Sequence, residues 1–343
     1  MKAIVIHAAH DLKIEDQEAA VPADGEVAVA IGSGGICGSD LHYYHQGGFG
    51  TVRLKEPMIL GHEVAGTITA LGAGVSALAV GDRVAVSPSC PCGSCKYCDR
   101  QLFNHCLNMR FYGSAMPFPH IQGAFRQNLI ALASQCHKLD DDTPTSHGAV
   151  AEPLAVTLHA CNRAGDMHGK SVLVTGCGPI GALAILAARH KGAAKITATD
   201  IEDTALDRAN ALGADAVINT RTNLEALEPL KAGKGTFDVM LEASGSEIAL
   251  RQGLDVLRPR GVLVQLGLGG DISIPQNTIV AKEIDLRGTF RFHEEFSEAV
   301  TAINSGAIDV ASLITHEFVL EDAVAAFEMA SDRSQAMKVQ IKF

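Results

Sequence analysis

The chain has 343 residues, of which 47% are hydrophobic and 20% are charged. This composition supplies one or two packed cores and excludes a disordered chain, a collagen-like repeat and a coiled coil. Asp and Glu number 39 against 28 Lys and Arg, and the net charge of −11 disfavours nucleic acid or an anionic membrane as a partner. The length fits two domains.

The first third of the chain has the pattern of β-structure. Segments rich in β-branched residues, separated by Gly, Pro and Asp, lie at residues 2–7, 26–31, 64–69 and 81–86. Many short strands joined by turns predict a small barrel-like domain. We expect no secretion signal, because the first apolar run is short and already includes His7.

Strands and helices alternate in the second half. After a connecting helix at 149–164, we expect strands at 171–175, 195–199, 216–219, 237–241 and 261–266, with helices at 180–191 and 204–212. Alternation of this kind predicts a parallel sheet with helices on both faces. Beyond residue 290 we expect two helices and a last strand at 338–343.

A glycine-rich turn follows the first strand of this series. The pattern G-x-G-x-x-G comprises Gly176, Cys177, Gly178, Pro179, Ile180 and Gly181. Such glycines let a pyrophosphate approach the helix N-terminus, although they also occur in ordinary tight turns. Asp200 ends the next strand and could bind the adenosine ribose hydroxyls. Because Asp200 would repel a 2′-phosphate and no Arg follows it at once, we expect NAD rather than NADP.

Nine cysteines occur in the chain, and five of them crowd between residues 90 and 106. Four have a spacing suited to a closed tetrahedral zinc site, which would be structural: Cys92, Cys95, Cys98 and Cys106. Free thiols that happen to lie close are the alternative, and Cys90 lies outside the pattern. With no export signal, the clustering favours a metal over disulfides and a cytoplasmic location.

A second set of possible ligands is dispersed along the chain: Cys37, His62, Glu63 and Glu152. Taken singly, a buried Cys is usually a packing residue and a buried His is usually hydrogen-bonded in a core. If the four converge, one thiolate, one imidazole and one or two carboxylates would leave Zn²⁺ with an open position. Such a site would be catalytic.

The sequence resembles a known enzyme family in several motifs. Gly61-His62-Glu63-x2-Gly66-x5-Gly72-x2-Val75, the four-cysteine segment and the glycine-rich turn, in this order, are similar to zinc-containing alcohol dehydrogenases of the medium-chain superfamily. Glu152 stands where the alcohol-oxidising branch usually has Cys, which is typical of the polyol branch. The resemblance leaves open whether Glu63 or Glu152 binds the zinc directly.

The resemblance implies a fold of the α/β plus β class. A GroES-like β-barrel catalytic domain would occupy residues 1–150, with the structural zinc lobe at about 90–106. A Rossmann domain with a doubly wound parallel sheet would occupy 151–290. Residues 291–343 would return to the catalytic domain.

The resemblance also implies a reaction. A zinc-dependent oxidoreductase of this kind transfers a hydride from a secondary alcohol of a polyol or sugar acid to NAD, with two Zn²⁺ ions per chain and a dimeric or tetrameric homo-oligomer. Ser39 would take the alcohol proton and His42 would pass it to solvent. From spacing alone, Ser39 would instead be a helix N-cap and His42 a surface residue.

Three further residues are candidates for binding the substrate. Segments around Tyr43 and Arg110 resemble dehydrogenases that act on sugar acids, and a carboxylate favours an Arg. Arg291 could bind hydroxyls, whereas Arg110 could be a plain surface charge and Tyr43 a packing residue. The alternatives are a sorbitol- or xylitol-type or L-threonine dehydrogenase, or a non-catalytic nucleotide-binding protein, which should have lost Cys37, His62 and Glu152.

Overall fold

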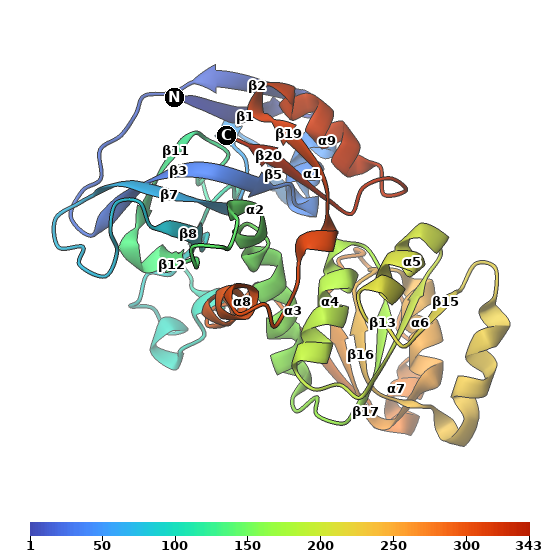
Figure 1. Ribbon diagram of the computed structural model, residues 1–343. Coiled ribbons are helices and arrows are strands. Elements are labelled where there is room, and N and C mark those ends of the chain that lie inside the picture. The colour runs from blue at the N-terminus through green and yellow to red at the C-terminus, as the bar shows by residue number, and fades with distance from the viewer. The chain divides into compact units, whose positions relative to one another are not determined.

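The computed structural model describes residues 1–343, and the chain divides into two compact units. The first unit comprises Met1–Glu152 and Phe296–Phe343, and the second comprises Pro153–Glu295 (Figure 1). The chain therefore leaves the first unit once and returns to it once. None of the helices is long and apolar enough to cross a membrane.

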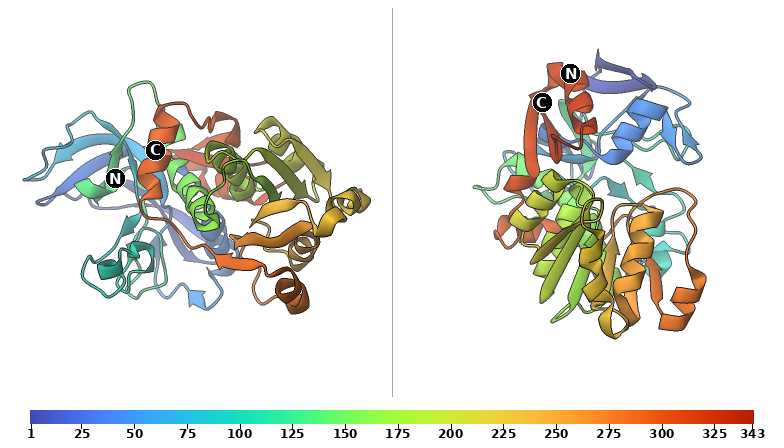
Figure 2. Two further views of the ribbon diagram at one scale, coloured as in Figure 1. Left: turned by 90° about the horizontal axis from the view of Figure 1, so that it is seen from below. Right: turned by 90° about the vertical axis from the view of Figure 1, so that its right-hand side faces the viewer.

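A seven-stranded sheet is the framework of the first unit. Its order is β12-β8-β7-β3-β20-β19, and β11 also pairs with β3. These strands are β3 (Glu26–Gly35), β7 (Glu63–Leu71), β8 (Arg83–Val86), β11 (Asn128–Leu132), β12 (Cys136–Lys138), β19 (Ile314–Val319) and β20 (Lys338–Lys342). The last strand, β20, pairs with β3 in antiparallel fashion, so the red C-terminal segment lies against blue N-terminal strands in Figures 1 and 2.

Shorter elements complete this unit. A three-stranded sheet has the order β2-β1-β6, and the pairs β4-β5 and β9-β10 are two-stranded. The strands are β1 (Lys2–Ala8), β2 (Asp11–Asp16), β4 (Gly48–Phe49), β5 (Val52–Arg53), β6 (Met58–Ile59), β9 (Ser89–Cys90) and β10 (Arg110–Phe111). The helices are α1 (Gly38–Gln46), α2 (Thr145–Gly148) and α9 (Ala323–Ser331), and short 3₁₀ turns lie at Cys98–Arg100, Phe103–His105, Ala133–Gln135, Ala311–Leu313 and Leu320–Asp322.

The core of the first unit joins both ends of the chain. Ile4 and Val29 from the N-terminal strands pack in one apolar cluster with Phe327 of α9 and Ile341 of β20, and all four are fully buried. Burying such side chains contributes about 1.5–3 kcal/mol each. The C-terminal segment is therefore an integral part of this unit.

The second unit is built on a six-stranded parallel sheet with the order β15-β14-β13-β16-β17-β18. The strands are β13 (Ser171–Thr175), β14 (Lys195–Asp200), β15 (Ala216–Asn219), β16 (Phe237–Glu242), β17 (Leu257–Gln265) and β18 (Asp285–Gly288). The helices are α3 (Ala151–Ala164), α4 (Pro179–His190), α5 (Asp203–Ala211), α6 (Glu247–Val256) and α7 (Gln276–Lys282), with 3₁₀ turns at Leu224–Lys234; α8 (Glu295–Asn304) leads back to the first unit.

Helices cover this sheet on both faces. In Figure 1, α4 lies on one side of β13 and β16, and α6 lies on the other. The central strand β13 has the sequence Ser-Val-Leu-Val-Thr and is buried at four of its five positions. A continuous apolar run, rather than alternation, is what a strand covered on both faces requires.

The structure differs from the sequence expectations at some boundaries. The connecting helix begins at Ala151 and is preceded by the separate short helix α2, while β17 begins at Leu257 rather than at 261. Strand β19 was not expected, because Ile314–Val319 mixes polar and apolar residues that are half-exposed or exposed. Its parallel pairing with β20 is a long-range contact that no local pattern indicates.

Candidate functional site

Three of the dispersed metal-ligand candidates come together in the first unit. Donor atoms of Cys37, His62 and Glu63 all lie within 4.8 Å of one another. Cys37 is the N-cap of α1, whereas Glu63 begins β7 and His62 directly precedes it. The fold thus joins a thiol, an imidazole and a carboxylate, which are the ligand types that zinc prefers.

His62 and Glu63 each have a buried polar atom without a hydrogen-bond partner. His62 is 5% exposed and Glu63 is 0% exposed, yet His62 Nδ1 and Glu63 Oε1 accept or donate no hydrogen bond. Buried polar groups are almost always hydrogen-bonded, so two unpaired ones side by side fit a bound cation. These three residues therefore fit a zinc ion.

The electrostatics of Cys37 also fit a cation. Burial, together with the neighbouring Glu63 carboxylate, raises the pKa of its thiol to about 12. A bound metal ion reverses this effect, because a coordinating thiol loses its proton outright. Cys37 is the N-cap of α1, and the positive end of a helix also stabilises the thiolate form that a metal binds.

Asp40 links the two segments that carry these donors, and the sequence analysis did not select it. Its fully buried carboxylate accepts hydrogen bonds from Cys37 N at 3.0 Å and from Gly61 N at 3.2 Å. Its Oδ1 also lies 3.7 Å from His62 Nδ1. The signal was the spacing Cys37-x-x-Asp40, which is that of a capping box.

Lys338 is a second residue that the sequence analysis missed. Its ammonium group, from the first residue of β20, forms an ion pair with Glu63 and donates to Ile36 O at 3.1 Å. Both charged side chains are nearly inaccessible, with 5% and 1% of their surface exposed. No sequence signal could have found Lys338, because it lies far from Glu63 along the chain.

Glu152 lies near the three donors but not among them. It is 5% exposed, and its electrostatic neighbours include His62, Glu63 and Cys37. Burial raises the pKa of its carboxyl to about 8, with opposing effects from His62 and Glu63. Its carboxylate is absent from the group whose donor atoms lie within 4.8 Å, which includes Glu63 instead.

Ser39 and His42 lie in α1, one turn apart. Ser39 is half-buried and His42 is exposed. Burial, together with the positive charges of Arg333 and His45, lowers the pKa of His42. The alternative that made Ser39 the N-cap is wrong, because Cys37 occupies that position and Ser39 lies within the first turn.

The three substrate candidates lie in different environments in the structure. Tyr43 is 2% exposed and its hydroxyl accepts a hydrogen bond from Ala115 N at 3.0 Å, so it lies in the core, as the packing alternative has it. Arg291 belongs to the second unit, where its guanidinium stacks on Phe290, 4.9 Å from the ring centroid.

Arg110 is exposed on β10, which pairs with β9. The ring of the next residue, Phe111, lies 5.5 Å from that of His62. The exposed position of Arg110 matches the surface-charge alternative, and its binding of a substrate carboxylate stays a prediction.

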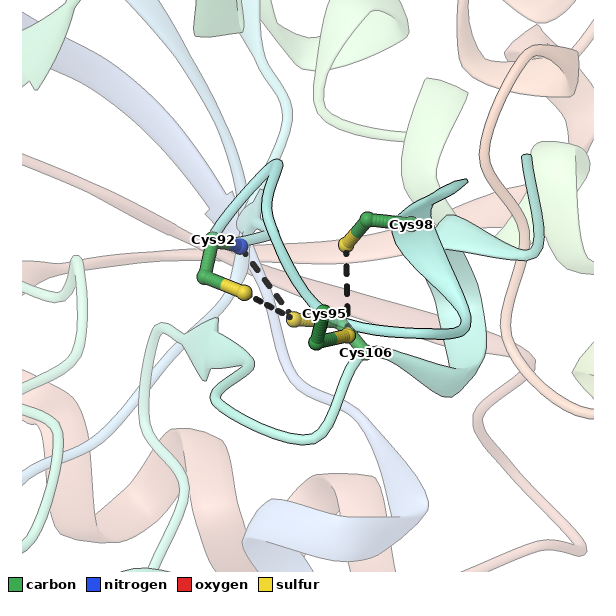
Figure 3. A group of neighbouring side chains, drawn as sticks. All are labelled: Cys92, Cys95, Cys98 and Cys106. Carbon is green, nitrogen blue, oxygen red and sulfur yellow. Dashed lines mark hydrogen bonds between the residues drawn. The ribbon is translucent and has the colours of Figure 1, made fainter. Parts of the chain in front are cut away.

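The four cysteines of the second cluster also converge. Their sulfur atoms lie within 4.8 Å of one another, and Figure 3 shows the side chains directed toward a common centre. Cys106 Sγ is 3.5 Å from Cys92 Sγ, and Cys95 Sγ is 3.6 Å from Cys98 Sγ. Because none of the nine cysteines forms a disulfide, four thiols in this arrangement fit a tetrahedral zinc ion.

Backbone amides donate hydrogen bonds to these sulfur atoms, which favours the thiolate form that binds a cation. Cys92 N and Asn108 N donate to Cys106 Sγ at 3.2 and 3.4 Å, and Leu107 N donates to Cys95 Sγ at 3.5 Å. The Ser94 amide, helped by the Asn108 side chain, lowers the pKa of Cys92 to about 6. Cys90 stands outside this group and pairs instead with Arg110 across β9 and β10.

The glycine-rich turn joins β13 to α4 in the second unit. Gly176 has φ +82°, which disfavours other residues, and a Cβ on Gly181 would lie 1.7 Å from Gly176 O. Gly178 is the N-cap of α4, Pro179 and Ile180 begin the helix, and the space around a Cβ on Gly178 is open. The exposed helix N-terminus therefore fits a pyrophosphate.

Asp200 ends β14 beside this turn. Its Oδ2 accepts a hydrogen bond from Cys177 N at 2.6 Å, and its Oδ1 accepts from Ile201 N at 2.7 Å and Glu202 N at 3.0 Å. The strand end and the glycine turn are thus held together. A carboxylate at this place fits the hydroxyls of an adenosine ribose.

Comparison with known proteins places the chain in a family. Residues 23–141 match the family model "Alcohol dehydrogenase GroES-like domain", and residues 179–305 match "Zinc-binding dehydrogenase". L-idonate 5-dehydrogenase (NAD(P)(+)) of Escherichia coli strain K12 is 43% identical over 92% of this chain and 91% of its own length. Sorbitol dehydrogenase of Bombyx mori is 38% identical over 99% and 97%.

A solved structure agrees with these matches. The crystal structure of L-idonate 5-dehydrogenase from Escherichia coli K-12 superposes with a TM-score of 0.96 and 40% identity, covering 100% of this chain and 98% of the other. The GroES-like domain and the Rossmann sheet expected from the sequence are therefore confirmed. The chain belongs to the zinc-binding, medium-chain family of alcohol and polyol dehydrogenases.

Proposed function

We propose that this enzyme oxidises the C5 alcohol of L-idonate to 5-keto-D-gluconate, with NAD as the hydride acceptor. The observation that carries the proposal is the group of Cys37, His62 and Glu63, with its unpaired buried atoms. The likeness to the Escherichia coli enzyme named for L-idonate supplies the substrate. Nine cysteines without a disulfide favour a reducing compartment such as the cytoplasm, and the family resemblance favours a homo-oligomer.

Zinc would be held by Cys37, His62 and Glu63, with an open position for the substrate. A zinc ion there acts as a Lewis acid that stabilises negative charge on the alcohol oxygen. We assign Glu63 as the direct ligand because its carboxylate lies within the donor group, and Glu152 as a buried neighbour outside it. The four cysteines at 92, 95, 98 and 106 would hold the second, structural zinc.

The protein's own residues would carry the proton away. Ser39, half-buried at the start of α1, would accept the alcohol proton while its own hydroxyl proton passes toward His42, three residues later on the same helix face. His42 would then release a proton to solvent. The lowered pKa of His42, caused first by burial, keeps its imidazole neutral at pH 7. A neutral imidazole can accept a proton, whereas an imidazolium cannot.

The second unit would bind the dinucleotide. The amides at the N-terminus of α4 hold the pyrophosphate, and Asp200 accepts hydrogen bonds from the adenosine ribose. The name of the Escherichia coli relative gives both NAD and NADP. We propose that NAD is preferred here, because the anionic Asp200 repels a 2′-phosphate.

A substrate panel tests the proposal. NADH formation is followed with L-idonate, sorbitol, xylitol and L-threonine at equal concentration, with and without a zinc chelator. We expect the highest kcat/KM for L-idonate and loss of activity with the chelator. A clear preference for sorbitol would contradict the sugar-acid assignment. It would instead support a polyol dehydrogenase, the alternative that the similarity to sorbitol dehydrogenases favours.

Two variants address the substrate carboxylate. If Arg291 binds it, Arg291→Ala raises the KM for L-idonate far more than the KM for sorbitol. Arg110→Ala is measured beside it, because Arg110 is exposed on β10 and is the other arginine that the sequence offers for the carboxylate. A selective effect of Arg110→Ala would instead support the assignment made from the sequence.

A further inference from the structure

An arginine lies beside the end of β14, although none follows Asp200 in the sequence. Arg221 lies in the turn that follows β15, and β15 is the strand next to β14 in the sheet. Asp200 and Asn219 are paired across the two strands. The guanidinium of Arg221 lies 3.0 Å from the carboxylate of Glu202, two residues after Asp200.

The backbone around Arg221 is fixed. Thr220 N donates to Asp200 O at 2.9 Å, and Asn219 Oδ1 accepts from Arg221 N at 3.0 Å. The Asn219 amide in turn donates to Asp203 Oδ1 at 2.5 Å. The loops that follow β14 and β15 are thus tied together, which holds the base of the Arg221 side chain next to Asp200.

The guanidinium itself is not fixed. The side chains of Arg221 and Glu202 remain 56% and 47% exposed, and exposed ion pairs of this kind contribute little to stability. A phosphate dianion offers Arg two parallel charge-assisted hydrogen bonds, which are stronger than one exposed contact with a carboxylate. Arg221 can therefore exchange Glu202 for a phosphate without loss to the fold.

We propose that Arg221 binds the 2′-phosphate of NADP and that Glu202 competes with this phosphate for it. The ribose 2′ position lies where Asp200 would bind its hydroxyl, and Arg221 is the cation that the adjacent strand brings to that place. Asp200 still favours NAD, whereas Arg221 limits the preference and permits the use of NADP. The inference rests on the proposed dinucleotide site but not on the proposed substrate.

The test compares two ligands that differ in this phosphate. Binding of 2′,5′-ADP and of 5′-AMP to the zinc-loaded protein is measured by calorimetry at fixed ionic strength. Arg221→Ala should lower the affinity for 2′,5′-ADP about tenfold, equivalent to about 1.4 kcal/mol. The affinity for 5′-AMP should stay within about twofold of the wild-type value. Glu202→Gln should raise the affinity for 2′,5′-ADP and leave the affinity for 5′-AMP unchanged.

A matched control is available in the same unit. Arg251 and Glu247 form another exposed pair, at 2.9 Å on α6, so Arg251→Ala should change neither affinity. An unchanged ratio of the two affinities in Arg221→Ala would overturn the inference. Equal weakening of both ligands would also overturn it, because a purely structural role predicts that result. Neither ligand is a substrate, so a failed substrate assignment leaves this measurement unaffected.

Discussion

Lys338 and Glu63 form a buried ion pair that connects the last strand of the chain to the candidate zinc site. Lys338 begins β20, and Glu63 begins β7. The two strands are not neighbours in the sheet, because β3 lies between them. The carboxylate proposed as a zinc ligand thus has a fixed positive partner on the side of β20.

Replacing Lys338 by Met should destabilise the protein strongly. In the zinc-free protein, removing one partner of this buried ion pair leaves an uncompensated charge, at a cost of about 3–5 kcal/mol. Urea unfolding of zinc-free Lys338→Met, Glu63→Gln and the double variant measures this cost and the coupling between the two residues. Lys342→Met is the control, because Lys342, also on β20, forms an exposed pair with Glu317 of β19 that should contribute about 1 kcal/mol or less. A double variant no more stable than Lys338→Met would argue against the ion pair as the cause.

The two cysteine groups should respond differently to substitution. Cys37→Ser removes a ligand from a site with an open position, so turnover should fall to about 1% or less while the melting temperature stays near that of the wild type. Cys95→Ser opens a closed site that stabilises the fold, so the yield of folded protein and its melting temperature should both fall. Zinc analysis should show the loss of one ion in each variant. Near-normal turnover of Cys37→Ser would contradict the assignment of the catalytic site.

Local sequence patterns predicted the parts of the site that depend on local geometry. The glycine-rich turn and the four-cysteine segment could be recognised because each is contiguous, and its function follows from the spacing of its residues. The group of Cys37, His62 and Glu63 could be proposed only through the family resemblance. Physical reasoning alone had no means of bringing two distant segments together.

The residues that the sequence analysis missed share one property. Lys338 forms an ion pair with Glu63, which lies on a strand distant in sequence. Arg221 forms an ion pair with Glu202 because the sheet brings the ends of two neighbouring strands together. Asp40 is the exception, because its capping-box spacing was visible in the sequence. Arg110, which the sequence offered as a substrate ligand, is exposed on β10, and its role stays a prediction.

Glu295 should make the second unit sensitive to acid. Burial opposes ionisation of its carboxyl, but hydrogen bonds with His159, Asn162 and His293 N outweigh burial and lower the pKa from 4.5 to about 2. Because the pKa is lower in the folded state, the stabilisation is complete above pH 4.5 and is lost as the pH falls toward 2. Glu295→Gln should lower stability by about 1–3 kcal/mol at pH 7.

The measurement is urea unfolding at a series of pH values. The difference between wild type and Glu295→Gln should shrink as the pH falls from 4.5 toward 2. Acid also protonates the cysteine ligands, but this loss of zinc affects both proteins alike and cancels in the difference. A constant difference over this range would show that Glu295 does not contribute through its charge.

Asp200 should set the cofactor preference of the enzyme. Repulsion between its carboxylate and a 2′-phosphate favours NAD by about 1–3 kcal/mol, or roughly 5- to 150-fold in kcat/KM. Asp200→Asn removes this charge at nearly constant volume and should narrow the difference in kcat/KM between NAD and NADP. Asp200→Ala should narrow the gap as well, but it should also weaken both cofactors, because Cys177 N in the glycine-rich turn loses its acceptor. Equal kcat/KM values for NAD and NADP in the wild type would contradict this role of Asp200. A gap that Asp200→Asn leaves unchanged would show that a group other than this carboxylate selects the cofactor.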